Sequence, residues 1–190
     1  MRTYIGKGAG AHIEMKLLGA KRYVLICSPY ISPDYASRVV SLASNNVAIR
    51  LITSNSQEPY QQQSLRILRD SITPPRGLFA FRKRRNWRRI PLELMIINEK
   101  LVHAKMYVID GDYAVVGSAN MTKNGFWDNI EYLMIFEGEE AQKIEEDFQT
   151  LWRVYLQHYR EYIQVFEYQE PIAPERSVFG SIVGKIFTRD

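Results

Sequence analysis

Apolar runs of four to eight residues alternate along the chain with segments in which apolar residues recur every three or four positions. The short runs are typical of buried β-strands, and the longer spacing is typical of amphipathic helices. The pattern predicts helices over residues 11–20, from residue 32 onward, over 57–72 and from about residue 139, and strands over 22–28, 47–53, 77–82, 91–97 and 130–136. This alternation indicates an α/β domain.

Each predicted helix has one apolar face, which we expect to pack against the sheet. These faces consist of Ile13, Leu17 and Ala20; Ala36, Val39, Val40 and Ala43; Leu65, Leu68 and Ile72; and Ile144, Phe148, Leu151, Trp152 and Tyr155. Residues 162–168 fit either a further strand or a contact between subunits. Pro171 and Pro174 disfavour regular structure beyond them.

A β-hairpin is predicted after the middle of the chain. Residues 107–109 favour a strand, the Asp-Gly pair at 110–111 is a turn signal, and residues 113–116 form the returning strand. Because side chains alternate between the faces of a strand, we expect His103 and Lys105 to project from one face of the first strand. The hairpin therefore places a nucleophile beside a cation.

The returning strand leads to Gly117, Ser118 and Asn120, which we expect beside the histidine. Glycine lets the backbone approach a ligand closely, and Ser118 could cap a short turn whose N–H groups point at an anion. A histidine nucleophile next to cationic and amide groups suits attack on a phosphodiester. The segment therefore predicts an enzyme that cleaves phosphodiesters.

The composition fits one domain. With 190 residues, of which 46% are hydrophobic and 24% charged, the chain can bury one sizeable core but hardly two. We expect a domain over residues 1–163 and a C-terminal extension over 164–190, packed on the domain or in an interface between subunits. The single cysteine, Cys27, cannot form an internal disulfide and is expected in a buried strand.

No apolar run reaches the length of a membrane span, and the first residues lack the apolar core of a signal peptide. We therefore expect a cytoplasmic protein without a membrane partner. The cysteine and histidine positions suggest no metal cluster, and we expect neither a metal nor another cofactor.

The segment around the hairpin resembles the signature of the phospholipase D superfamily. The positions that match this signature in type and spacing are His103, Lys105, Asp110, Gly117, Ser118 and Asn120. Asp110 lies at the predicted turn, where hydrogen bonds that fix the loop are favoured over contact with substrate. Glu131 resembles the acidic residue that follows the signature on the next strand, and Ser28-Pro29-Tyr30 resembles a common family turn. The likeness covers about residues 10–160.

The resemblance implies a phospholipase D-like fold, a mixed β-sheet flanked by helices on both faces. It also implies a covalent phosphohistidine intermediate, formed without a metal in a site made of two signatures. In that site His103 would attack phosphorus, and Glu131 would orient its imidazole. Lys105 and Asn120 would hold the non-bridging oxygens, with Ser118 assisting.

Most members of this superfamily carry two signatures, whereas this chain has three histidines and one signature. The simplest source of the second half-site is another copy of the chain across a two-fold axis. We therefore expect a homodimer in which His103 of the partner subunit protonates the leaving oxygen. The smallest single-signature members, bacterial nucleases among them, are similar in length to this chain.

A cationic run precedes the catalytic segment and bears on the substrate. It contains six cations around one tryptophan: Arg82, Lys83, Arg84, Arg85, Trp87, Arg88 and Arg89. Cations that flank a cleft can follow a polyanion, and an indole can stack on a base. The run could instead be a solvated hairpin tip or could bind anionic lipid headgroups.

Together these features predict a metal-independent nuclease that hydrolyses DNA or RNA. A phospholipase or phosphatidyl transferase is the alternative within enzymes, and a non-catalytic nucleic-acid-binding module of the same fold is the alternative outside them. The complete signature argues against the last of these.

Overall fold

The computed structural model describes residues 1–75, 87–98 and 102–168. Within them, eight strands form one sheet in the order β1-β7-β6-β5-β2-β3-β4-β8. The strands are β1 (Arg2–Gly6), β2 (Tyr23–Cys27), β3 (Ala48–Asn55), β4 (Leu92–Asn98), β5 (Met106–Ile109), β6 (Tyr113–Gly117), β7 (Glu131–Glu137) and β8 (Ile163–Phe166). The helices are α1 (Ala11–Leu18), α2 (Pro33–Ser44), α3 (Pro59–Ile72), α5 (Glu139–His158), the π-helix η2 (Asn124–Asp128) and the short 3-10 helix η3 (Arg160–Tyr162).

The sheet is mixed, as expected. Strands β2, β3 and β4 are parallel neighbours, and the other pairs are antiparallel. The two parallel connections run through α2 and α3, because parallel strands need a crossover. None of the helices in the described ranges is long and apolar enough to cross a membrane.

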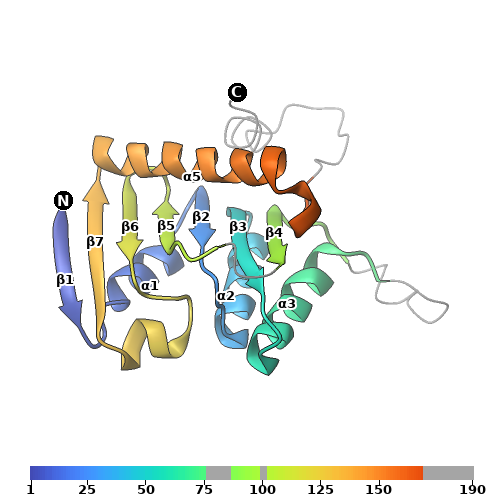
Figure 1. Cartoon of the computed structure of the whole chain (residues 1–190), viewed down its shortest axis with the longest axis horizontal. Coiled ribbons are helices and arrows are strands. Elements are labelled where there is room, and N and C mark those ends of the chain that lie inside the picture. The colour runs from blue at the N-terminus through green and yellow to red at the C-terminus, as the bar shows by residue number, and fades with distance from the viewer. Residues whose placement is uncertain (76–86, 99–101, 169–190) are drawn as a thin grey trace.

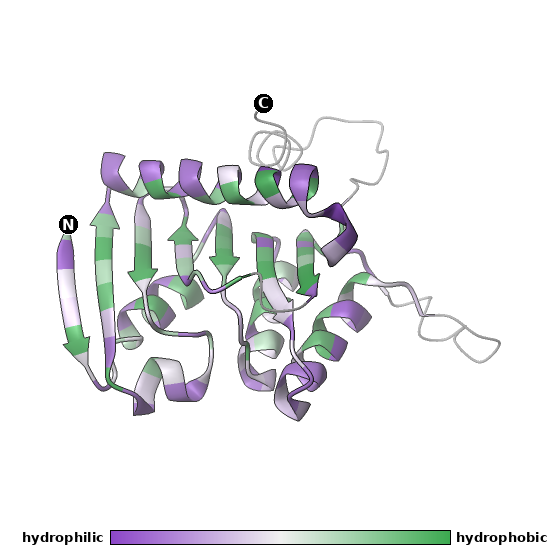
Figure 2. Ribbon diagram, viewed as in Figure 1, coloured by the Kyte–Doolittle hydropathy of each residue, from purple (hydrophilic) through white to green (hydrophobic). Residues whose placement is uncertain are grey.

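Helices cover both faces of the sheet, which confirms the predicted architecture. One core cluster joins the apolar sides of α1, α2 and α3 to residues such as Val24, Leu51 and Val115. A second cluster joins α5 to the opposite sheet face, where Phe148 and Trp152 pack with residues of β2 and β4. Figure 1 shows α5 crossing the strands in the upper part of the view and the other helices below it. The sheet strands are largely apolar, while α5 carries polar residues on its outer side (Figure 2).

Several boundaries differ from the sequence predictions. Strand β1 was not predicted, because its five residues are mostly exposed and form the edge of the sheet beside β7. Residues 162–168 do contain a strand, β8, which pairs with β4, so the sheet continues to Phe166, beyond the expected domain boundary. The predicted strand over 77–82 lies outside the described residues.

One edge of the sheet brings together the ends of six strands, and we call it the catalytic edge. It is formed by the C-terminal ends of β2, β3, β4 and β6 and the N-terminal ends of β5 and β7. In Figure 1 the arrows of β2 and β6 point down and those of β5 and β7 point up, so this edge lies low in the view. His103 precedes β5, and Asn120 follows β6, so the strand order brings both to this edge.

Candidate active site

His103 and Lys105 lie just before β5 rather than within it. Their segment, 102–105, has no regular secondary structure, so the expectation that both project from one strand is wrong. Instead His103 is exposed while the Lys105 side chain folds back beneath it. Its Nζ donates to the His103 carbonyl oxygen at 2.7 Å and lies 3.3 Å from both ring nitrogens. The pairing of cation and imidazole is thus formed by a local turn of the chain.

Lys105 is a buried cation. Only 6% of the residue is exposed, and this burial lowers the pKa of its ammonium group, although the nearby Cys27 and Glu131 act in the opposite direction. A desolvated ammonium that faces the site interacts more strongly with a phosphate oxygen than an exposed one would. The Cys27 thiol donates weakly to the Ala104 carbonyl at 3.5 Å, and burial raises its pKa to about 12. Cys27 is therefore a packing residue, as its place in a strand predicted.

Asn120 is held from two sides. The Tyr107 hydroxyl donates to the carbonyl of the preceding Ala119 at 2.8 Å, and Gly125 in η2 packs directly on the Asn120 backbone. The Asn120 Oδ1 atom is buried and has no hydrogen-bond partner in the described part of the chain. A buried polar atom without a partner is uncommon, and functional sites are where such atoms gather. The unpartnered atom is an acceptor, so a phosphate oxygen would be bound by the Nδ2 donor of the same carboxamide.

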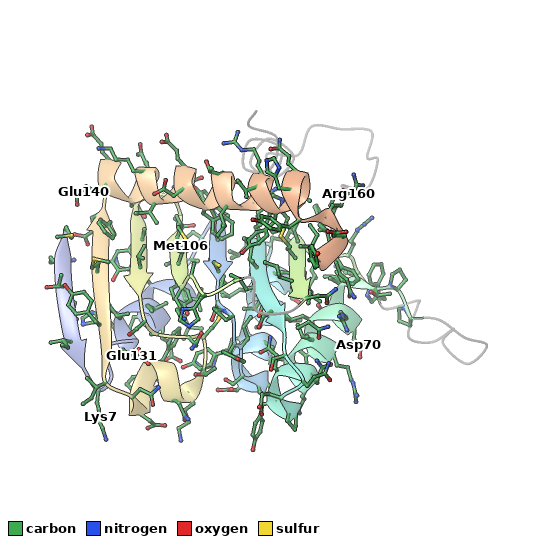
Figure 3. The ribbon with its side chains drawn as sticks, in the orientation of Figure 1. Lys7, Asp70, Met106, Glu131, Glu140 and Arg160 are labelled. Carbon is green, nitrogen blue, oxygen red and sulfur yellow. The ribbon has the colours of Figure 1, made fainter. Side chains whose placement is uncertain are left out.

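Ser118 and Glu131 form a pair across β6 and β7. The Ser118 hydroxyl donates to Glu131 Oε2 and accepts from the Tyr132 amide at 3.0 Å, while Asn129 Nδ2 donates to Glu131 Oε1 at 3.1 Å. Figure 3 labels Glu131 at the start of β7. In the described residues the hydrogen bonds of Glu131 do not reach His103, and the Ser118 hydroxyl is already engaged. The structure therefore places both residues as supports of the loop that carries Asn120.

Gly117 is required by the sheet rather than by a ligand. A Cβ atom at this position would lie 2.3 Å from the Tyr132 carbonyl oxygen, because β6 and β7 approach closely here.

Ser28, in the turn Ser28-Pro29-Tyr30, ties the loop that carries Asn120 to the end of β2. Its hydroxyl donates to the Tyr30 carbonyl at 2.8 Å and accepts from the Met121 amide at 2.9 Å.

Asp110 lies at the other end of β5 from His103. Its carboxylate accepts from the backbone amides of Lys21, Arg22 and Tyr23 at 2.7–3.0 Å. Its φ of 54° lies in the left-handed region, as the predicted turn requires. The four residues of β5 lie between His103 and Asp110 and span about 13 Å, so Asp110 is not brought together with the other signature residues. It fixes the start of β2 to the hairpin.

An amide cluster at the same edge was not predicted from the sequence. Asn55 at the end of β3 donates to Asn98 Oδ1 at 3.0 Å, and Gln62 Nε2 donates to Asn55 Oδ1 at 2.9 Å. Asn55 and Asn98 are partly exposed at the C-terminal ends of the neighbouring parallel strands β3 and β4, and Gln62 lies in the first turn of α3. In α/β sheets, ligands often bind at the C-terminal ends of parallel strands, and this rule is the one signal that could have pointed to the amide cluster from the sequence.

The structure describes only part of the cationic run. Residues 82–86 lie outside the described ranges. Arg88 and Arg89 are exposed, and Trp87 is half-buried, with its Nε1 buried and unpartnered in the described residues. These residues precede β4, at the end opposite the catalytic edge, so the structure does not bring them to His103.

No group of three or more histidine, cysteine, aspartate or glutamate side chains within residues 1–75, 87–98 and 102–168 is arranged to hold a metal ion. The independence of the reaction from metals remains a prediction.

Comparisons with known proteins agree with the fold and with the family resemblance noted in the sequence. A family model described as "Cardiolipin synthase, PLD-like domain" matches residues 13–152. A cardiolipin synthase from Listeria monocytogenes is 28% identical over 136 residues, which are 68% of this chain and 24% of that protein. A mitochondrial cardiolipin hydrolase from Xenopus laevis is 26% identical over 149 residues, 77% of this chain and 62% of that protein. The chain thus spans about a quarter of the first relative and less than two thirds of the second.

Among solved structures, Nuc from Salmonella typhimurium, a phospholipase D family member, superposes with a TM-score of 0.61 at 14% identity. The match covers 88% of this chain and 99% of that one. At this identity the likeness concerns the fold alone.

Proposed function

This chain belongs to the phospholipase D superfamily, whose members act as phosphodiesterases or phosphotransferases, and from that premise we propose that it is a homodimeric, metal-independent nuclease. One observation carries the proposal. The exposed His103 ring lies 3.3 Å from the buried Lys105 ammonium, at the edge where the Asn120 carboxamide also lies. These are a nucleophile and two groups able to stabilise negative charge on phosphate oxygens.

In the proposed reaction an imidazole nitrogen of His103 attacks phosphorus. An N–P bond forms, the P–O bond to the leaving group breaks, and His103 of the partner subunit gives the leaving oxygen its proton. Water then attacks the phosphohistidine. His103 of the partner subunit takes the water proton, and the N–P bond breaks to release a phosphate monoester and free imidazole. Lys105 and Asn120 hold the non-bridging oxygens in both steps.

The shared site rests on the count of signatures. One chain supplies one histidine of this kind, while the reaction uses a nucleophile and an acid on opposite sides of phosphorus. A two-fold axis at the catalytic edge would place the two His103 residues so that each serves as the acid for the other. Nucleic acid is the proposed substrate because the chain concentrates six cations in residues 82–89.

Phosphatidyl chemistry is the second candidate, because the matching family model and both sequence relatives carry cardiolipin in their names. One experiment separates the candidates. Purified protein is incubated in EDTA with single-stranded DNA, duplex DNA, RNA or cardiolipin vesicles, with His103→Ala as the control. We expect nucleic-acid cleavage that survives EDTA and is lost in His103→Ala. Cleavage of lipid alone would favour the second candidate, and activity that needs added magnesium would contradict the histidine mechanism.

The intermediate and the shared site have their own tests. Protein quenched in alkali during turnover of a labelled substrate should carry label on His103, since phosphohistidine survives alkali and is hydrolysed in acid. Dimers that combine one His103→Ala subunit with one intact subunit should be far below half as active as wild type. A fully active monomer, measured by light scattering, would contradict the shared site.

A further inference from the structure

Trp127 is an exposed aromatic residue that the proposed mechanism does not use. It lies in the π-helix η2, and 46% of its surface is exposed. Most aromatic side chains of this size are largely buried, and π-helical turns are frequent at functional sites. The position therefore calls for a reason other than packing.

The indole is held rigidly from its N–H edge. Its Nε1 donates to Glu14 Oε2 at 2.9 Å and lies 3.3 Å from the Tyr35 hydroxyl. Glu14 is 8% exposed, and its other oxygen accepts from Arg38. Tyr35 is 2% exposed and packs edge-on against Phe126, with ring centroids 4.9 Å apart. The N–H edge is thus fixed to the core, and the exposed part of the ring is apolar.

The helix that carries Trp127 also contacts the active site. Gly125 packs on Asn120 so closely that a Cβ atom there would lie 2.3 Å from the Asn120 carbonyl oxygen. On the other side of η2, Asn129 donates to Glu131 at 3.1 Å. Trp127 therefore sits on a short element bounded at both ends by residues of the candidate site.

We propose that Trp127 is a stacking platform for an unpaired base next to the scissile phosphate, so that single-stranded nucleic acid is the preferred substrate. The inference rests on the proposed nuclease function and names its substrate class. A fixed indole face loses little conformational freedom when a base stacks on it, and stacking tolerates any base sequence. Duplex bases are already stacked on one another and gain less from the indole.

A membrane contact is the less favoured reading of the same residue. Tryptophan at a membrane interface presents an apolar ring to the lipid and a free N–H to water or headgroups. Here the N–H is bound to Glu14. The orientation favours a ligand that contacts only the face and outer edge of the ring.

Binding is measured in a His103→Ala background, so that substrate is not consumed, with a fluorescent single strand and its duplex. Alanine replacement of a stacking aromatic reduces affinity by about 5- to 150-fold per base. We expect Trp127→Ala to lose this much affinity for the single strand and at most about threefold for the duplex. Trp127→Phe keeps a ring face without the N–H and should retain most of the affinity. Tyr60→Ala is the matched control, because Tyr60 is 74% exposed on α3 outside the proposed platform.

The outcomes are distinguishable. If the protein with intact His103 cleaves single strands and Trp127→Ala binds them as tightly as its parent, the platform is wrong and the nuclease assignment stands. If the parent neither binds nor cleaves nucleic acid, the proposed function itself fails. Equal losses on single strand and duplex in both Trp127 variants would show that the residue serves the fold of η2. Loss of the dimer, or of binding to cardiolipin vesicles only, would assign Trp127 to an interface or a membrane and overturn the platform.

Discussion

Lys105 shows how one buried side chain can set the pH range of the site. Its ammonium group must be protonated to hold phosphate oxygens, and burial lowers its pKa below the usual value for lysine. For a small bis-aryl phosphodiester, whose leaving group departs without a proton from His103 of the partner subunit, kcat/KM should therefore fall as the pH rises through this lowered pKa, below the pH of about 10.4 at which exposed lysine titrates.

The variant Lys105→Arg tests this assignment, because a guanidinium stays protonated throughout the accessible range. The overall rate should drop, because the planar guanidinium of arginine places its N–H donors differently from the lysine ammonium. The alkaline fall in kcat/KM should nevertheless disappear. If kcat/KM falls at the same alkaline pH in the wild type and in Lys105→Arg, a group other than Lys105 is titrating.

Asp110 shows the opposite case, a signature residue whose role is structural. Its carboxylate accepts from three backbone amides at the start of β2, far from His103 along β5. Asp110→Asn tolerates the left-handed backbone but removes the charge, so the free energy of unfolding should fall by about 1–3 kcal/mol. Urea denaturation measures the change, and Asp112→Asn in the same turn is the control. An active-site role would instead appear as lost turnover without lost stability.

At the level of elements, η2 determines the position of Asn120. A Cβ atom on Gly125 would lie 2.3 Å from the Asn120 carbonyl oxygen and 2.9 Å from its amide nitrogen, so Gly125→Ala must push the loop outward. A displacement of about 1 Å in a catalytic group can cost about 100-fold in rate, and we expect a loss of kcat of that order.

The matched control is Gly19→Ala. A Cβ atom at Gly19 would come no closer than 3.4 Å to neighbouring oxygens. The control should keep wild-type kcat. Circular dichroism of both variants should show the native fold, which separates loss of position from loss of structure.

The hydrophobic periodicity predicted most of the helices and strands, and the spacing of particular residue types predicted the signature. Neither pattern predicted how these elements fit together. Helix α2 was predicted because Pro33 opens a segment with one continuous apolar face, and β3 because its run is largely apolar. The five residues of η2 are too few to show a period, and no local pattern indicates that Gly125 must fit against Asn120. Likewise the family resemblance identified Ser118 and Glu131 as site residues, but only the pairing of β6 with β7 shows that they bind each other.

At the level of the whole molecule, the described part of the cationic run and the active site lie at different ends of the sheet. Arg88 and Arg89 precede β4, whereas His103 lies at the opposite edge, three strands away. Strand length and spacing place them about 25–30 Å apart. Only a long polyanion could contact both.

This separation predicts a dependence on substrate length. At about 3.4 Å per phosphate along one strand of a duplex, 25–30 Å corresponds to about eight phosphates. Replacing Arg88 and Arg89 by Gln should weaken the binding of a 20-base-pair duplex and lower its log-log salt slope by about 0.9 for each phosphate that the variant no longer neutralises. A six-base-pair duplex bound at the catalytic edge cannot reach the run, so its affinity should change little. Equal reductions on both lengths would mean that the run acts through the fold or the dimer, and unchanged affinity on both would remove the run from the binding surface.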